Sequence, residues 1–195
     1  MQKLKRNDSG VWVLVATSCD FSHPDANICC TGVGKINAAI AARHIIDTEN
    51  PRLILSLGSV SSGAFEFGQI INPTGWVQRD MNLCEFLGPK YVTPMSGDEQ
   101  IIKYGMRDDK YPNAVCGSGD TWIKDMSEEI WNCVDIDGFA IAVVCRAADV
   151  PFISYKFVTD GKSCKVSPDE WSELADQSRE SLHWIYDEIM DDEDE

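Results

Sequence analysis

The 195-residue sequence has no long hydrophobic run and only three histidines. No stretch approaches about 18 consecutive apolar residues, so we expect no transmembrane helix. The basic N-terminus, Met1–Arg6, is not followed by an apolar segment, and we therefore expect no signal peptide and a cytoplasmic location.

Metal and disulfide chemistry also lack their usual patterns. The three histidines are far apart and form no HExxH motif, and the eight cysteines form no CxxC pair. Without a signal peptide, such cysteines are typical of reduced thiols in a core. We expect neither a metal site nor a cofactor.

Positive charge is scarce as well. The sequence has 17 basic and 32 acidic residues, which gives a net charge of −15. This balance argues against nucleic acid or an anionic membrane as the main partner, although local donors would still permit a small anionic ligand. We expect one domain over residues 1–195, with disordered tails at 1–9 and at 191–195, where the acidic run lies.

Apolar and β-branched runs alternate with helical patterns along the chain. Buried strands are expected at Val11–Val15, Asn27–Cys30, Leu53–Leu57, Ala114–Cys116 and Phe152–Val158. Two shorter strands, 69–71 and 75–78, are expected to flank Asn72–Thr74. Helices are expected at 35–47, at 137–148 and from a capping sequence at Ser167–Glu170 onward. This alternation predicts an α/β domain with a mixed, largely parallel sheet.

Two segments interrupt this pattern. Gly58–Gly63 contains only small residues apart from Val60, and we expect a loop there in which backbone approaches a ligand closely. Arg79–Tyr111 has no sustained period, and a loop of this length in a compact domain is usually functional or an interface.

Carboxylates stand at the start of the predicted helix 137–148 and after the strand that follows it. Asp135 and Asp137 open an apolar helical run, and Asp160 follows the strand at Phe152–Val158. In an α/β sheet such positions share one crevice, which favours acid–base chemistry. Two plainer alternatives are that Asp160 begins a turn with Gly161 and that Asp137 only caps its helix.

Five motifs also resemble a known family. They are Thr31–Ala39 (TGVGKINAA), Leu57–Ser59, Ser118–Asp120, Asp135–Asp137 and Val158–Asp160. Together they resemble the nucleoside phosphorylase/nucleosidase superfamily, and above all methylthioadenosine/S-adenosylhomocysteine nucleosidases. The resemblance implies a three-layer α/β/α sandwich around a twisted sheet, and hydrolysis of the N-glycosidic bond of a purine nucleoside.

The resemblance also implies roles for three carboxylates. Asp160 matches the general acid that protonates the purine, and Asp137 matches the carboxylate that binds the sugar, although the family usually has Met-Glu where this chain has Ile136-Asp137. Asp20 matches the glutamate that activates water in the hydrolases. His23 is the alternative base, and Asp20 is equally well interpreted as a surface-loop residue.

Six further residues are expected to contact the substrate. Trp122 matches an aromatic that packs on the base, with core packing as its alternative role. The others are Ile123, Ile136, Gly58, Ser59 and Arg79.

The nucleophile is expected to be water. Phosphorylases of the superfamily carry an arginine just before the Gly-Ser motif, whereas Leu55–Leu57 has no cation. Because Arg79 could reach the site from elsewhere, a purine nucleoside phosphorylase is one alternative. A non-catalytic nucleoside-binding protein is another, since both matched glutamates are replaced by aspartate.

A homodimer is the expected assembly. In resembling enzymes a long loop completes the partner's pocket, and Arg79–Tyr111 occupies that place here. Its apolar side chains, Met81, Leu83, Phe86 and Leu87, are expected to bury surface between the two copies.

Overall fold

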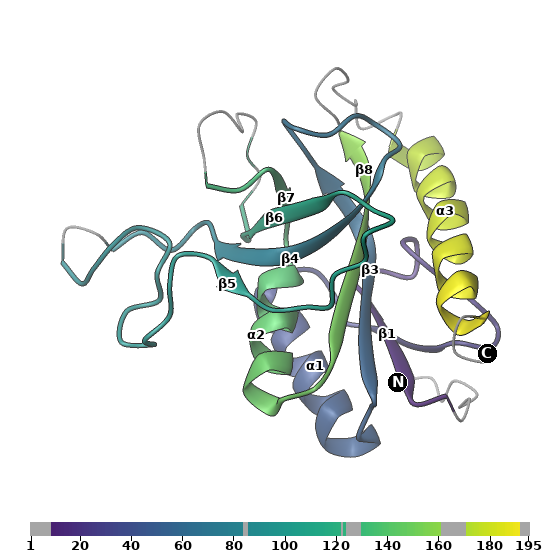
Figure 1. Ribbon diagram of the computed structural model, residues 1–195, viewed down its shortest axis with the longest axis horizontal. Coiled ribbons are helices and arrows are strands. Elements are labelled where there is room, and N and C mark those ends of the chain that lie inside the picture. The colour runs from purple at the N-terminus through teal and green to yellow at the C-terminus, as the bar shows by residue number, and fades with distance from the viewer. Residues whose placement is uncertain (1–8, 84–85, 122, 124–129, 161–170, 192–195) are drawn as a thin grey trace.

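One mixed sheet of eight strands organises the molecule (Figure 1). The computed structural model describes residues 9–83, 86–121, 123, 130–160 and 171–191. Its strands are β1 (Val11–Val15), β2 (Asn27–Cys30), β3 (Leu53–Ser61), β4 (Ile70–Gln78), β5 (Ile102–Lys103), β6 (Asn113–Ser118), β7 (Cys133–Asp135) and β8 (Phe152–Asp160). Its helices are α1 (Lys35–Glu49), α2 (Gly138–Ala148) and α3 (Trp171–Asp191).

The sheet closes on itself. Its strands follow the order β2-β1-β3-β7-β6-β4-β5, and β8 pairs with both β3 and β4. The pairing of β8 is parallel to β3 along Ile54–Ser61 and antiparallel to β4 at Ile70 and Ile71. The α/β class with a mixed sheet, predicted from the sequence, is therefore confirmed. The strands β3, β7, β6, β4 and β8 form a closed ring, a feature that was not predicted.

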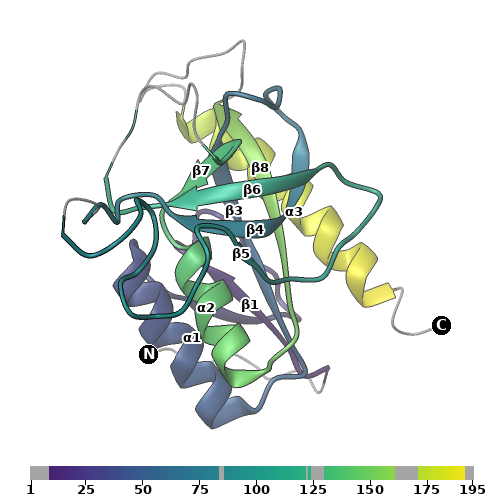
Figure 2. The ribbon, with the colours of Figure 1, turned by 60° about the vertical axis from the view of Figure 1, so that its left-hand side comes forward.

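Helices lie on both sides of this sheet. In the two views α1 and α2 run side by side on one side, whereas α3 lies on the other (Figures 1 and 2). Ala42 of α1 and Ile141 of α2 share a fully buried core with the sheet. A second core lies under α3, where Leu182 and Ile185 pack against strand residues such as Leu55. Each helix thus buries apolar side chains against the strands, although Ile36 and Ile40 of α1 remain exposed.

Several strands extend further than local patterns predicted. The segment Gly58–Ser61, expected to be a loop, continues β3 because β8 pairs with it, with a shift of register between Val60 and Ser61. Asn72–Thr74, expected to separate two strands, lies inside β4, which accommodates Pro73 through a shift of register between Pro73 and Gly75. The short strands β5 and β7 were not predicted.

The segment 79–111 is mostly irregular, as expected, apart from β5, and much of it projects away from the sheet (Figure 1). The two expected tails, 1–9 and 191–195, fall outside the described residues except for Ser9 and Asp191, the last residue of α3. The expected helix cap at Ser167–Glu170 also lies outside them. No helix in the described part of the chain combines the length and apolar character needed to cross a membrane.

Candidate functional site

A cavity of about 690 Å³ opens where several strands end. Its walls come from the residues after β1, the second half of β3, the residues after β4 and β6, and the ends of β7 and β8. All of these are carboxyl ends of strands, where α/β sheets usually bind ligands. The exposed wall area is mainly apolar, so the few polar groups in it stand out as candidates for specific contacts.

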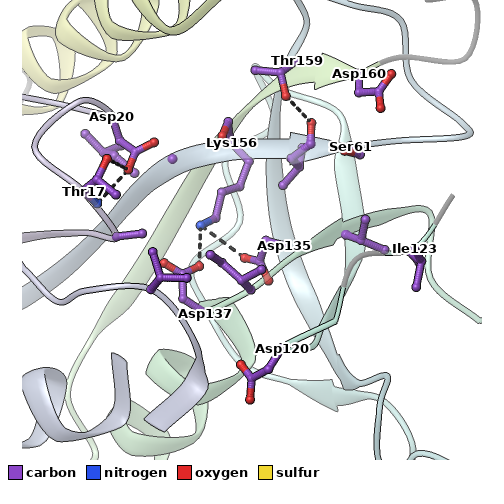
Figure 3. A pocket seen from close by; sticks show the side chains of 18 of the residues that line it. Thr17, Asp20, Ser61, Asp120, Ile123, Asp135, Asp137, Lys156, Thr159 and Asp160 are labelled. Atoms are coloured by element: carbon purple, nitrogen blue, oxygen red, sulfur yellow. Dashed lines mark hydrogen bonds and ion pairs between the residues drawn. The ribbon is translucent and has the colours of Figure 1, made fainter. Parts of the chain in front are cut away.

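The cavity gathers the carboxylates that the sequence singled out. Asp20, Asp137 and Asp160 all line it, although they come from three distant parts of the chain (Figure 3). The predicted contact residues that also line it are Gly58, Ser59, Arg79, Ile123 and Ile136. Trp122 lies outside the described residues.

Asp137 occupies the N-cap position of α2, but its side chain makes no cap hydrogen bond. Its backbone carbonyl instead accepts hydrogen bonds from the amides of Ala140 and Ile141. The carboxylate turns toward the sheet, where Oδ1 accepts a hydrogen bond from Lys156 Nζ at 3.3 Å. The backbone of Asp137 thus caps the helix, and its side chain lines the cavity.

Lys156 is the principal residue that the sequence analysis missed. It lies in the middle of β8 and is 1% exposed. Its Nζ lies 3.2 Å from Asp135 Oδ2 and 3.3 Å from Asp137 Oδ1, and Figure 3 shows it extending between the two carboxylates. A lysine inside the apolar run FISYKFV was the available signal, because a buried charge needs charged or polar partners.

Gly58 makes room for this ammonium group. It pairs with Lys156 across β3 and β8, and a Cβ atom at Gly58 would lie 3.4 Å from Lys156 Nζ. The expected close approach of this backbone to a ligand stays a prediction. The part of β3 that borders the cavity contains no basic residue, and the cation at this place is Lys156 of β8.

The three charges shift one another's proton affinity. Burial raises the pKa of Asp137, Lys156 opposes that rise, and Asp135 adds to it, with a net pKa of about 6. Burial also acts to raise the pKa of Asp135, but Lys156 and the Ser118 hydroxyl outweigh it and hold that pKa below its ordinary value. Burial alone would lower the pKa of Lys156, yet the attraction of Asp137 and Asp135 raises it, so the ammonium stays charged.

Asp135 is fixed by the surrounding backbone as well. Ser118 Oγ donates to Asp135 Oδ1, and the Gly138 amide donates to Asp135 Oδ2 at 3.1 Å. A Cβ atom at Gly138 would lie 2.2 Å from the Trp76 ring and 2.5 Å from Asp135 Oδ2, so no larger residue fits there without displacement. Asp135 thus anchors Lys156 at the end of β7.

Asp160 has a different environment. It is the last residue of β8, and its backbone carbonyl accepts a hydrogen bond from the Ser62 amide at 2.7 Å. Among the described residues, none donates to its partly exposed carboxylate. The alternative of a turn begun with Gly161 involves a residue that is not described. Asp160 is therefore held through its backbone, and its side chain borders the cavity.

Asp20 is held within its own loop. Its Oδ2 accepts hydrogen bonds from the amide of Thr17 at 2.8 Å and from the Thr17 hydroxyl at 2.9 Å. His23, the alternative base, is not among the cavity residues, and its Nε2 lies 3.4 Å from Asp187 Oδ1 of α3. The structure therefore brings Asp20 to the cavity and leaves His23 against α3.

Arg79 borders the cavity, but its guanidinium is hydrogen-bonded mainly to backbone carbonyls. Its guanidinium donates to the Gly119 carbonyl at 2.9 Å, to Thr121 Oγ1 at 3.2 Å and also to the Thr121 carbonyl. These contacts hold the segment after β6, which also carries Ile123. Within the described ranges, no group of three or more His, Cys, Asp or Glu side chains is arranged to hold a metal ion.

Comparison with known families and sequences gives one consistent result. The model of the phosphorylase superfamily matches residues 18–190. A 5′-methylthioadenosine/S-adenosylhomocysteine nucleosidase of Haemophilus ducreyi is 26% identical over 200 residues, covering 88% of this chain and 86% of the relative. One of Staphylococcus haemolyticus is 29% identical over 150 residues, covering 67% of this chain and 66% of the relative.

Solved structures share the fold. A 5′-methylthioadenosine/S-adenosylhomocysteine nucleosidase of Helicobacter pylori with butyl-thio-DADMe-Immucillin-A superposes with a TM-score of 0.75 at 17% identity, over 91% of this chain and 97% of the other. A futalosine hydrolase of the same organism superposes with a TM-score of 0.75 at 13% identity, over 93% and 97%. At such identities the likeness concerns the fold.

Proposed function

Because this chain belongs to the phosphorylase superfamily, we propose that it is a nucleosidase, a hydrolase that cleaves the N-glycosidic bond of a purine nucleoside with water. The observation that carries the proposal is the meeting of Asp20, Asp137 and Asp160 around one mainly apolar cavity. The names of the relatives make 5′-methylthioadenosine and S-adenosylhomocysteine the first substrates to test.

The chemistry of the bond explains why carboxylates suit this site. The purine leaves as an anion unless it is protonated, and the sugar becomes positively charged as the bond breaks. Asp160 is the general acid that delivers a proton to the purine. Asp137 holds the sugar and places negative charge beside it, and Asp20 orients and activates the water.

The apolar walls then receive the base and the sugar ring. Ile123 and Ile136 present aliphatic surface to the cavity, and Gly58 and Ser59 border it along β3. A planar purine between aliphatic side chains buries apolar area without needing a charged partner. Trp122, implied by the family resemblance to stack on the base, remains a candidate outside the described residues.

The charges around the cavity favour water over phosphate as the nucleophile. Two cations of the described chain line the cavity, and both have partners: Lys156 is paired with two carboxylates, and the terminal nitrogens of Arg79 donate to the backbone and to Thr121. Among the described residues, a phosphate dianion would therefore meet several carboxylates and no cation without a carboxylate or backbone partner. Water carries no charge and meets no such opposition.

A panel of nucleosides, with and without phosphate, tests this proposal. We expect 5′-methylthioadenosine, S-adenosylhomocysteine or adenosine to yield free purine and free sugar at a rate independent of phosphate. Formation of a sugar 1-phosphate would identify a phosphorylase instead. Binding of nucleosides without turnover, measured by calorimetry, would identify a binding protein and contradict the proposed hydrolysis.

The exposed apolar side chains of the segment 79–111 support a homodimer. Phe86 is 81% exposed, Leu87 is 53% exposed and Leu83 is 41% exposed, and all three follow Met81 closely in the sequence. We expect light scattering at micromolar concentration to give about twice the 21.7 kDa mass of one chain. Phe86→Ser should shift the protein toward monomer, whereas Trp184→Ser, on the exposed face of α3, should not. A monomeric parent protein would rule out the dimer.

A further inference from the structure

The five aspartates that line the cavity differ in how many of their carboxylate oxygens are already occupied. They are Asp20, Asp120, Asp135, Asp137 and Asp160. An oxygen that already accepts a hydrogen bond inside the protein has fewer lone pairs left for a substrate hydroxyl, and a neighbouring cation restricts the directions from which that hydroxyl can approach. The number of oxygens without a partner therefore indicates how many substrate hydroxyls each carboxylate can bind.

Two of the five have both oxygens occupied. Asp135 accepts from Ser118 on Oδ1, and from Gly138 and Lys156 on Oδ2. Asp120 accepts from the Lys35 amide on Oδ1 at 2.9 Å, and its Oδ2 lies 3.2 Å from Lys35 Nζ. Both carboxylates therefore stabilise the protein, and substrate binding is assigned to the other three aspartates.

Asp137 is half occupied. Lys156 Nζ donates to Oδ1, while no donor of the described residues reaches Oδ2. Lys156 has little freedom to release Oδ1, because its side chain is 1% exposed and its ammonium is confined between Gly58 and Asp135. The aspartate side chain is also short, so the carboxylate cannot advance into the cavity to present both oxygens.

We propose that Asp137 holds a single hydroxyl of the sugar through Oδ2, and that the site consequently accepts a nucleoside lacking the other hydroxyl of the 2′,3′ pair. This inference rests on the proposed nucleosidase function. A carboxylate with both oxygens open would grip the two neighbouring hydroxyls together and require both. With Lys156 on Oδ1, one hydroxyl is recognised and its neighbour is not, which makes Lys156 a specificity-determining residue.

The first test compares adenosine, 2′-deoxyadenosine and 3′-deoxyadenosine by release of adenine. We expect kcat/KM for at least one deoxynucleoside to stay within about tenfold of that for adenosine. Sites that hydrogen-bond a hydroxyl reject the analogue lacking it by about 10⁴ to 10⁵. Cleavage of adenosine with losses of more than about 10³ for both analogues would overturn the inference and leave the nucleosidase function intact. Failure to cleave any nucleoside of the full panel would refute both.

The second test repeats the series with Asp137→Asn. Each nucleoside is compared with itself in the two proteins, so the differing intrinsic stability of the three glycosidic bonds cancels. The analogue that lacks the held hydroxyl should lose at least tenfold less rate on substitution than adenosine loses, because its contact was already missing. The other analogue should lose as much as adenosine.

Two outcomes of this second test would contradict single-hydroxyl recognition. If both analogues are less sensitive to Asp137→Asn than adenosine, the carboxylate holds both hydroxyls. If both lose as much as adenosine, it holds neither. The series with the parent protein needs no variant, so the inference remains open to refutation even if Asp137→Asn does not fold.

Discussion

Asp160→Asn is expected to lower kcat by about 10² to 10⁴, the usual contribution of a general acid. The amide has nearly the shape of the carboxyl group but cannot deliver a proton to the departing purine. Because this contribution is made in the transition state, KM should change little. Steady-state kinetics with the best nucleoside of the panel, across a range of pH, measures the effect.

The environment of Asp160 makes this substitution informative. No described residue donates to its carboxylate, and the residue is anchored through its backbone to Ser62, so the asparagine should not disturb the fold. Asp109→Asn, at a side chain that is 94% exposed, is a suitable control and should leave kcat unchanged. If Asp160→Asn keeps more than about a third of the parent kcat with an unchanged unfolding midpoint, Asp160 is not the acid.

Lys156→Met is expected to reduce the free energy of unfolding at neutral pH by about 3 to 5 kcal/mol, the usual effect of removing one partner from a buried ion pair. Methionine fills similar space but leaves Asp135 and Asp137 facing each other without a cation. Chemical denaturation followed by tryptophan fluorescence measures the loss. Lys103→Met, at an exposed position of β5, should change the free energy of unfolding by less than about 0.5 kcal/mol.

The pH dependence of this loss follows from the pKa shifts. Asp137 has a folded pKa of about 6, above the ordinary value, so the stability it contributes is complete below about pH 4 and is lost as pH rises through 6. Lys156 has a raised pKa, so its stabilisation is complete throughout the neutral range. Without Lys156, the pKa of Asp137 should rise further, because the cation that opposes the rise is gone, and the destabilisation should increase as pH rises above 6.

Protonation of Asp137 should relieve part of the strain in the variant. The difference in unfolding free energy between Lys156→Met and the parent protein should therefore narrow below about pH 5. A difference that stays constant from pH 5 to pH 8 would show that the loss comes from packing and not from the unpaired carboxylates.

Local sequence patterns predicted the helices and strands whose own residues show a clear hydrophobic pattern. The helices α1, α2 and α3 and the strands β1, β2 and β8 lie where apolar spacing placed them, with boundaries shifted by a few residues. β7 has three residues, too few to show a period, and was missed. The extension of β3 through Gly58–Ser61 depends on pairing with β8, almost 100 residues away, which no local pattern reports.

The family and the location of the site could also be predicted. Five short motifs in a fixed order indicated the superfamily, and the family match over residues 18–190 confirms it. The rule that ligands bind at carboxyl ends of parallel strands indicated that Asp137 and Asp160 would meet, and both line the cavity. Their catalytic roles remain predictions.

The electrostatic arrangement of the site was beyond the sequence analysis. Lys156 lies four residues before Asp160 in the sequence. This spacing does not predict that the Lys156 ammonium lies near Gly58 of β3 and contacts Asp135. Such a contact arises from the closing of the sheet, which brings β8 beside β3 and near the end of β7. Asp135 likewise drew attention as an acidic residue, but its part as an anchor depends on Ser118 from another strand.

The closure of the sheet has a consequence for how this protein behaves when concentrated. The three nine-residue strands, β3, β4 and β8, each have neighbours on both sides, and the sheet ends instead at β2, with four residues, and at β5, with two. Exposed strand edges are the usual templates for intermolecular β-pairing and fibril growth, and short edges are poor ones. The folded protein should therefore resist edge-to-edge aggregation until β8 separates from β3 and β4.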